Sequence, residues 1–347
     1  MKIGFLIPNK FVSHNFVCLM QGFHALGWEI CTNWNFPDGL ISRGISAPFE
    51  SVSSDYLQKV DSNELTDDLL LVDVSDGFGD YFDKLCKLAE TRPVVLTNME
   101  DPANFRDYPE CFIVFSAHFN RLATREGRLY PLGFNLSEDL ILLSNAQDLS
   151  RKRNVIVRNF NDTFSQSVRN SLDLVFVKSL EKFFEMDRRR TSPSEYLSQL
   201  SRSAAICSYG GDFMPNFWEN EQLRKNWEQE GQRTYKFKYL GAEPVVLRWD
   251  SWRFFESAIM ACAPIQLDFG KYGFAYPTNP EPWVHYIPVD LSSVSSLPQH
   301  LSDRVKDDPE FMFKIGRNAR QWVIENFSPR KQAEYVLSVV SSIWPKL

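Results

Sequence analysis

The chain has 347 residues, ordinary shares of apolar and charged side chains, and a formal net charge of −6. This length exceeds what one hydrophobic core usually serves, so we expect two domains. The acidic balance argues against nucleic acid as the main partner, because proteins that bind a phosphate backbone carry a basic excess. No segment reaches the roughly 18 to 20 consecutive apolar residues of a membrane span. We therefore expect a cytoplasmic protein that contacts a membrane only peripherally, if at all.

The first half of the chain alternates short apolar runs with segments of helical spacing. Strands are predicted at residues 2–7, 28–33, 68–74, 93–97 and 111–115, and helices at 14–26 and about 81–90. Continuous apolar strands separated by helices indicate a parallel sheet that is covered on both faces. We expect residues 1–148 to form a Rossmann-like, doubly wound domain.

The second half shows the same alternation after a polar stretch at 144–153, which has the composition of a linker. Strands are predicted at 154–158 and 203–208, and helices at 164–184 and 192–200. We expect a second Rossmann-like domain over 149–330 and a helix within 331–347 that packs back on the first domain. The fold class is then α/β, with two parallel-sheet domains facing a cleft. Ligands of such sheets bind beyond the carboxyl ends of the strands.

A strand, a helix and a second strand are predicted at 245–247, about 252–262 and 263–267, which together read as one βαβ unit. Asp250 or Ser251 is a plausible N-cap for the helix. The start of a helix presents free backbone N–H groups and a partial positive charge, so it suits an anion such as phosphate.

Three polar side chains, Arg253, Glu256 and Ser257, share one face of this predicted helix. The planar guanidinium of Arg253 suits a diphosphate, and the two oxygens of Glu256 suit the hydroxyls of a ribose. The alternative is a surface ion pair, which would contribute only about 0.2 to 0.5 kcal/mol.

The segment 251–265, SWRFFESAIMACAPI, resembles a motif of the exostosin-type and related GT-B glycosyltransferases. In those enzymes a Ser-aromatic-Arg-aromatic-x-Glu-Ala helix leads into a turn with a small residue, Cys and Pro. Residues 283–290 and 315–323 resemble the strand and the Gly-x-x-Ala-Arg helix that follow. The resemblance implies that Glu256 holds the donor ribose and that Arg253 holds the donor phosphates. It covers the last third of the chain, and the remainder only as architecture.

One position departs from the retaining members of this fold. They often carry another Glu seven or eight residues before the ribose Glu, where this chain has Trp249 and Arg248. The stereochemical outcome stays open, with a lean towards inversion. The resemblance implies a nucleotide sugar as co-substrate and no metal or other cofactor, and no DxD motif stands in a metal-binding loop position. No GxGxxG follows the first strand, and no P-loop motif is present.

Two further features could contact the donor. Gly210 and Gly211 follow the strand predicted at 203–208, and paired glycines let backbone N–H groups approach a phosphate closely. A simple tight turn is the alternative. Arg248 lies at the end of the strand that precedes the helix. Residues 213–232 are polar and Trp-bearing, and we interpret them as a mobile lid or a disordered insert.

A general base for the acceptor hydroxyl should come from the first domain. His14 follows the first predicted strand, although a helix-capping or surface role is the alternative. Asp101 follows the strand at 93–97, where it could equally cap a helix that begins at Pro102. We predict a glycosyltransferase acting on a glycan, a lipid-linked or a small-molecule acceptor. The alternative is a catalytically silent two-lobed nucleotide- or sugar-binding protein.

Overall fold

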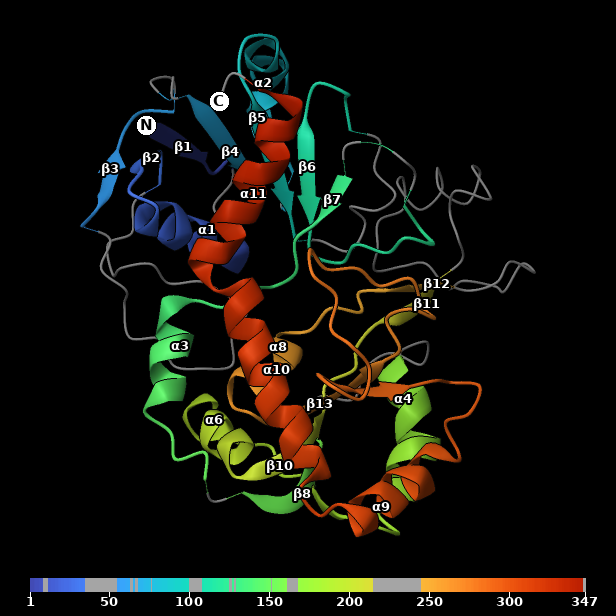
Figure 1. The fold of residues 1–347 in the computed structure, drawn as a ribbon. Coiled ribbons are helices and arrows are strands. Elements are labelled where there is room, and N and C mark those ends of the chain that lie inside the picture. The colour runs from blue at the N-terminus through green and yellow to red at the C-terminus, as the bar shows by residue number, and fades with distance from the viewer. Residues whose placement is uncertain are drawn as a thin grey trace.

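The computed structural model describes residues 1–8, 12–34, 55–62, 65, 68–75, 77–99, 108–124, 127, 129–150, 152–160, 168–214 and 245–345. They form two lobes, each built around a parallel sheet (Figure 1). We call them the N-lobe and the C-lobe. Asp101 and residues 215–232 of the predicted lid lie outside the described residues.

The N-lobe contains a seven-stranded parallel sheet in the order β3-β2-β1-β4-β5-β6-β7. From β1 the chain adds β2 and β3 on one side, and then β4 to β7 on the other side. The strand order therefore switches between β1 and β4, where Phe5 lies beside Leu71. Its strands are β1 (Lys2–Leu6), β2 (Glu29–Thr32), β3 (Leu57–Lys59), β4 (Leu69–Asp73), β5 (Val94–Asn98), β6 (Ile113–Ser116) and β7 (Leu129–Pro131).

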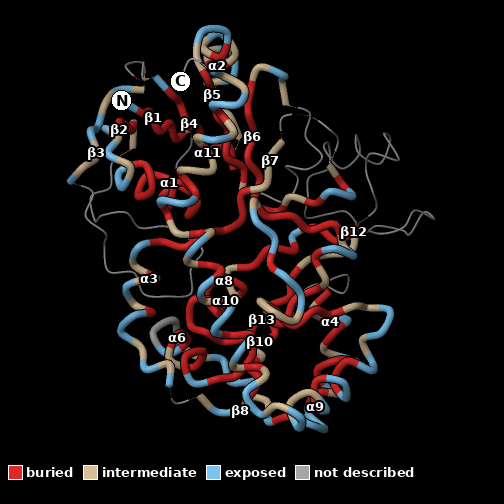
Figure 2. The backbone as a smooth tube through the Cα atoms, in the orientation of Figure 1, coloured by how far each residue is buried: buried red, intermediate tan, exposed pale blue. Residues whose placement is uncertain are grey.

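Both faces of this sheet are buried, as Figure 2 shows for β4 and β5. Alternate strand residues point to opposite faces. Leu69 and Leu71 join a core with α1 (His14–Ala25) and α11 (Pro329–Ile343), whereas Leu70 and Val72 join a core with α2 (Phe82–Ala89). A short 3₁₀ turn, Gly79–Tyr81, precedes α2. This two-sided burial explains why the strands read as continuous apolar runs.

The C-lobe contains a five-stranded parallel sheet in the order β14-β13-β10-β8-β9 and a separate antiparallel pair, β11-β12. Its strands are β8 (Arg153–Val157), β9 (Glu185–Asp187), β10 (Ser203–Cys207), β11 (Asp212–Met214), β12 (Val245–Leu247), β13 (Ala263–Leu267) and β14 (Ile287–Val289). Its helices are α3 (Glu138–Asn145), α4 (Val168–Leu172), a π-helical turn (Asp173–Val177), α5 (Lys178–Leu180), α6 (Pro193–Ser201), α8 (Trp252–Ile259), α9 (Leu297–Asp307) and α10 (Phe311–Phe327).

The predicted α/β class with two parallel sheets is confirmed. The βαβ unit predicted at 245–267 is wrong in its first strand. β12 does not enter the parallel sheet but pairs antiparallel with β11, and β13 lies instead between β10 and β14. A three-residue apolar run cannot reveal its partner, and Arg248 turns the chain away from the strand with a left-handed φ of 56°.

The lobes are joined on one side by two neighbouring chain segments. The first runs from β7 to α3, where the Leu136 N–H donates to the Phe327 carbonyl at 3.0 Å. In the second, α10 of the C-lobe ends and α11 of the N-lobe begins on either side of Ser328. α11 then packs against α1, so both marked chain ends lie in the N-lobe (Figure 1). Among the described helices, none combines the length and apolarity needed to cross a bilayer.

Candidate active site

The carboxyl ends of the two sheets face each other. The loop after β6 donates from the Arg121 N–H to the carbonyl of Gly273, which lies in the loop after β13, at 2.7 Å. In α/β sheets this edge carries the ligand site. The candidate site is therefore built from the residues after β8, β10 and β12 on the C-lobe and those after β1, β4 and β6 on the N-lobe.

Guanidinium groups gather at the C-lobe edge. Arg158, directly after β8, forms an ion pair with Asp173 and lies 4.2 Å from the centre of the Phe160 ring. Arg169, in the first turn of α4, lies 5.1 Å from the same ring and donates from Nε to the Tyr209 carbonyl at 3.1 Å. Phe160 thus holds two cations beside the ends of β8 and β10.

Arg253 of α8 belongs to the same cluster. Its Nε donates to the Asn159 carbonyl after β8 at 2.7 Å. Burial, and next the neighbouring Arg253, lower the pKa of Arg169 to about 10. Within the described residues, neither Arg169 nor Arg253 forms an ion pair with a carboxylate. Two buried or half-buried cations held close together create a positive potential, which an anion would relieve.

The start of α8 lies in the interlobe region. Ser251 is its N-cap, as predicted for this position, and its Oγ accepts from the Arg253 N–H at 3.3 Å. One backbone N–H beside this helix start already has an acceptor, because Oδ1 of Asp250 accepts from the Ser251 N–H at 2.8 Å. Asp250 also accepts from the Tyr276 hydroxyl, and its burial raises its pKa well above the usual value. The charge at the helix start therefore depends on the protonation of Asp250.

Gly210, Gly211 and Arg248 lie beside the arginine cluster. A Cβ on Gly210 would lie 3.3 Å from Nη2 of Arg169. Gly211 has a φ of +108°, and a Cβ there would lie 2.8 Å from the Leu247 carbonyl oxygen, so the close approach of the β12 strand requires glycine. Arg248 lies 3.6 Å from Asp212 and is 47% exposed. The structure thus brings together Gly210, Gly211, Arg248 and Arg253 with Arg158 and Arg169.

Glu256 and Ser257 lie deeper in the C-lobe. Both are fully buried. Burial, and next the nearby Glu256 carboxylate, raise the pKa of Tyr196 in α6, which places Glu256 against that helix. Ser257 Oγ donates to the Phe254 carbonyl within α8 at 2.9 Å. Of the three residues that share this face by spacing, only Arg253, in the first turn, is partly exposed.

On the N-lobe, His14 begins α1 and packs edge-on against Trp252 of α8, with ring centres 4.2 Å apart. Its Nε2 lies 3.0 Å from the Cys18 sulfur. Burial lowers the pKa of His14 to about 3, so the ring is neutral at pH 7 and a weak base. Asp73, at the end of β4, accepts from the backbone N–H groups of Ser13 and Ser75 and thereby fixes the loop before α1.

A second histidine, His118, follows β6. It is buried between the lobes, and its ring lies 5.2 Å from that of Phe134 in the linker. Burial, and next the positive charge of Arg248, lower its pKa to about 3. Because the Arg248 charge acts on it, His118 lies on the same side of the interlobe region as the cationic cluster.

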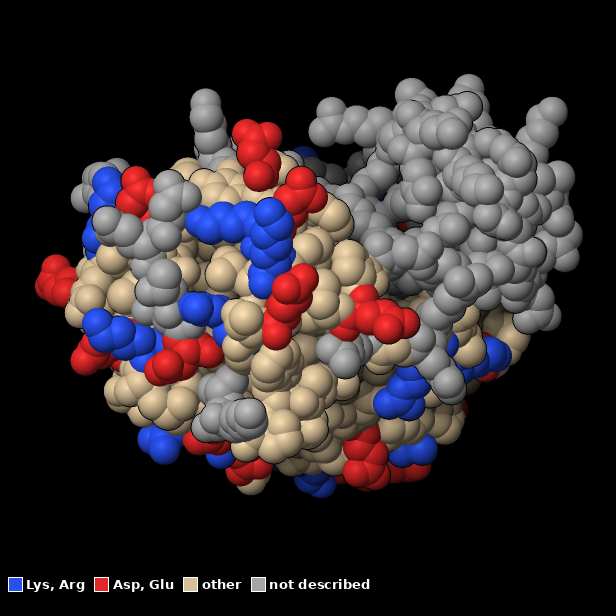
Figure 3. Space-filling model, turned by 90° about the horizontal axis from the view of Figure 1, so that it is seen from above, with Lys and Arg blue, Asp and Glu red and all other residues tan. Residues whose placement is uncertain are grey.

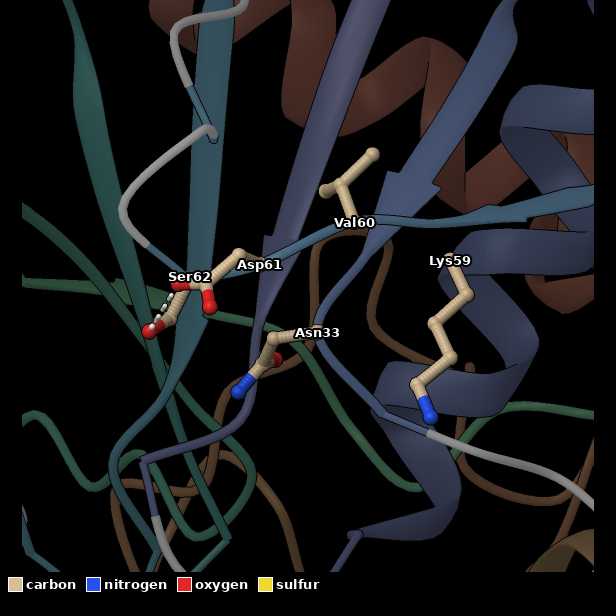
Figure 4. Close-up of a pocket in the computed structure, with 5 residues that line it drawn as sticks. All are labelled: Asn33, Lys59, Val60, Asp61 and Ser62. Carbon is tan, nitrogen blue, oxygen red and sulfur yellow. Dashed lines mark hydrogen bonds between the residues drawn. The ribbon is translucent and has the colours of Figure 1, made fainter.

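An open polar pocket of about 470 Å³ lies at the ends of β2 and β3. It is lined by Asn33, Lys59, Val60, Asp61 and Ser62, and in the view of Figure 4 Asn33 stands between Lys59 and the Asp61–Ser62 pair. Asn33 is fixed by two hydrogen bonds to the backbone of Ile7, at 2.8 and 2.9 Å. The pocket offers a cation, a carboxylate and a hydroxyl to a polar ligand.

Figure 3 shows the face of the molecule at the N-lobe end. Seen from above in Figure 3, acidic and basic side chains are interspersed. Among the residues with described positions, no group of three or more His, Cys, Asp or Glu side chains is arranged to hold a metal ion.

The sequence interpretation missed Arg158, Arg169 and His118. Arg158 and His118 each come within two residues of a strand end, so the rule that ligands collect at carboxyl edges could have selected them. Arg169 follows no strand. It reaches the site because α4 begins beside Gly211, whose carbonyl accepts from the Val168 N–H at 3.0 Å.

No protein-family model and no curated protein sequence matches the chain. Solved structures do match over the full length. One is an alpha-glucosyltransferase in complex with UDP-glucose and DNA containing an abasic site, with 11% identity, coverage of 98% of this chain and 99% of that one, and a TM-score of 0.55. Another is a glycosyltransferase from Rickettsia africae ESF-5, with 12% identity, coverage of 100% and 99%, and a TM-score of 0.54. The likeness shows that the chain has the GT-B glycosyltransferase fold. The exostosin-like subfamily stays a prediction.

Proposed function

We propose that the protein is a glycosyltransferase that moves a sugar from a nucleotide diphosphate donor to a hydroxyl group of an acceptor. The observation that carries this proposal is the gathering of Arg158, Arg169 and Arg253 at the C-lobe strand ends, opposite the N-lobe. The GT-B fold supports it.

In the proposed reaction the acceptor oxygen forms a bond to the anomeric carbon while the bond from that carbon to the diphosphate breaks. The proton of the acceptor hydroxyl passes to a base, and the diphosphate leaves with its added negative charge. Arg169 and Arg253 would stabilise that charge, and Arg248 would assist. Ser251 and the backbone N–H groups of Gly210 and Gly211 would complete the donor site. We propose an inverting reaction without a metal.

Glu256 is assigned to the donor ribose. Because its carboxylate is buried against α6, this role requires the side chain to turn away from Tyr196 when the donor binds. Ser257, which donates within α8, would support that turn of the helix. Replacement of Glu256 by Ala would then remove the nucleoside contact, and the phosphate contacts alone would not suffice for measurable stabilisation.

Asp101 and His14 are the proposed acceptor-side groups. The pKa of about 3 makes His14 a poor base at neutral pH, so Asp101→Asn is the sharper test. A glycan, a lipid-linked or a small-molecule acceptor fits the proposal, and the polar pocket at β2 and β3 would receive its hydroxyl-bearing part. The low pKa of His14 also favours the alternative of a catalytically silent nucleotide-sugar-binding protein.

Thermal stabilisation by UDP, GDP, CMP and dTDP tests the donor site. We expect one nucleotide to raise Tm, and Arg253→Ala and Glu256→Ala each to abolish that rise, because a ligand stabilises the native state only when its concentration exceeds Kd. Arg317→Ala is the matched control, since Arg317 is exposed and forms an ion pair with Glu310, the N-cap of α10, away from the site. Equal shifts in the wild type and in both site variants would contradict the assignment.

Turnover separates the enzyme from the silent binder. We expect slow release of the nucleotide from its cognate sugar donor in water, and faster release with the right acceptor. Acceptors to test include oligosaccharides, lipid-linked sugars and DNA. Nucleotide binding without release under any of these conditions would favour the binder.

A further inference from the structure

The loop after β6 contacts the C-lobe directly, apart from the linker. Phe119, Asn120 and Arg121 of the N-lobe contact Val246, Trp249 and residues 272–275 of the C-lobe. We call this set of contacts the latch. Asn120 and Phe274 form an antiparallel bridge, so the backbone of one lobe pairs with that of the other.

Asn120 is the centre of the latch. It is fully buried, and its Nδ2 donates to two C-lobe carbonyls, of Val246 at 2.8 Å and of Tyr272 at 3.1 Å. Its Oδ1 accepts from the Leu122 N–H at 2.9 Å. Both N–H donors and the carbonyl of the amide are therefore used. Only a side chain with two donors and an acceptor in this arrangement satisfies all three positions.

The neighbouring residues strengthen the same contact. The Phe119 carbonyl accepts from the indole Nε1 of Trp249 and from the Ala275 N–H, both at 3.2 Å. The Trp249 ring stacks on Phe274 with centres 4.4 Å apart. Gly273 has a φ of +71°, and a Cβ there would lie 2.7 Å from Asn120 Oδ1 and 2.6 Å from Leu122 Cγ. A larger residue at 273 would therefore have to displace the side chain of Asn120 or Leu122.

The C-lobe partners of the latch lead directly into the candidate donor site. Val246 lies in β12, and Trp249 lies between Arg248 and the start of α8. The Trp249 carbonyl also accepts from Gln266 of β13 at 3.3 Å, which ties it to the parallel sheet. The latch therefore contacts both Val246 and Trp249, on either side of Arg248 and shortly before Ser251 and Arg253.

We propose that Asn120 is a positioning residue that fixes the separation of the lobes and the placement of the segment leading into α8. The inference rests on the proposed function for its effect on the donor. Its structural part, the spacing of the lobes, does not depend on which ligand binds.

Asn120→Asp is the primary test. The substitution keeps the shape and the acceptor, but it removes both donors and places a carboxylate opposite two carbonyls. We expect a larger radius of gyration in small-angle scattering of the unliganded protein, at temperatures where it is fully folded. We also expect the affinity for the stabilising nucleotide to fall roughly tenfold. Ser203→Ala is the matched control, because its buried Oγ donates to the Gln199 carbonyl at 2.8 Å at the far end of β10.

Gly273→Ala tests the latch from the C-lobe side, in case Asn120→Asp does not fold. The added Cβ must displace Asn120 or Leu122, so we expect the same two changes. The double variant should change little further, because both substitutions break one contact. A merely structural role would lower Tm and leave the lobe separation of the folded protein unchanged.

The outcomes separate the two claims. Unchanged scattering in both folded variants would overturn the latch, whatever nucleotides do. Opened lobes with unchanged nucleotide affinity would overturn the positioning role of Asn120. A wild type that binds no nucleotide would refute the proposed function, while scattering would still decide whether the latch exists.

Discussion

The two edges that face each other across the interlobe region differ in charge. The C-lobe edge holds the guanidinium groups of Arg158, Arg169, Arg248 and Arg253. The N-lobe edge holds neutral His14 and His118, and the Asp73 carboxylate there is occupied by backbone donors. Under the proposed function, the same parallel-sheet architecture would provide an anion site on one side and a polar site with both Lys59 and Asp61 on the other. A transferase that takes a charged donor and an uncharged acceptor needs this difference.

The largest effect should come from the cationic edge. We expect Arg169→Met to lower nucleotide affinity about 100-fold, or about 2.7 kcal/mol, because a buried guanidinium contributes charge-assisted hydrogen bonds to an anion. Arg169→Lys should recover only part of the loss, since a point charge does not reproduce the planar fork. Isothermal titration calorimetry would measure both, with Arg317→Met as control. If Arg169→Met bound the nucleotide with an affinity within threefold of the wild type, Arg169 would not be a donor-binding residue.

The next effect concerns the stability of the C-lobe that carries this edge. Lys152 Nζ lies within 3.2 Å of four carbonyl oxygens, which its three N–H groups share: those of Leu200 and Ser201 in α6, Ser203 at the start of β10, and Met260 after α8. We expect Lys152→Met to lower the free energy of unfolding by about 2 kcal/mol, because it leaves these carbonyls without their charged donor. Urea denaturation would measure it. Loss of less than about 0.5 kcal/mol would show that water replaces the ammonium group.

A third effect belongs to the N-lobe edge. The folded protein lowers the pKa of His14 and His118 to about 3, so between pH 6.5 and 3 the unfolded state binds more protons. Stability therefore falls as pH is lowered through this window, by up to about 1.4 kcal/mol per pH unit for each histidine. We expect His14→Gln to flatten that slope relative to the wild type. Comparing the two proteins cancels the opposite contributions of Asp73 and Asp250, whose pKa values are raised. Parallel pH curves would show that folding does not lower the pKa of His14.

The smallest effect should appear at the polar pocket. We expect Lys59→Met to raise the KM for the acceptor about threefold, as expected for one exposed polar contact, and to leave nucleotide affinity unchanged. Initial-rate kinetics with each substrate varied would separate the two. Lys87→Met on α2 is the control, since it changes the same charge outside the pocket. A larger change in the KM for the donor than in that for the acceptor would show that the pocket binds the donor.

The sequence allowed the two parallel sheets to be predicted, because strands buried on both faces read as uninterrupted apolar runs. The apolar run at 245–247 led to a wrong prediction of its sheet, because burial alone does not distinguish a parallel neighbour from the antiparallel partner Asp212–Met214. Ser251 could be identified as a cap from its own type and position. The meeting of Arg158, Arg169 and Arg253 could not, because it depends on how α4 and α8 approach Phe160 and Asn159. The roles of the predicted site residues stay predictions.

The passage of the chain through Ser328 makes the N-lobe discontinuous in sequence. Ala333, Val336 and Val340 of α11 cover the face of its sheet that also holds Phe5 and Leu71. During synthesis this face is covered only by α1 until the ribosome has released residues 329–343, long after the strands themselves have emerged. The C-lobe lies between the two parts and can assemble first. We therefore expect the nascent N-lobe to depend on chaperones.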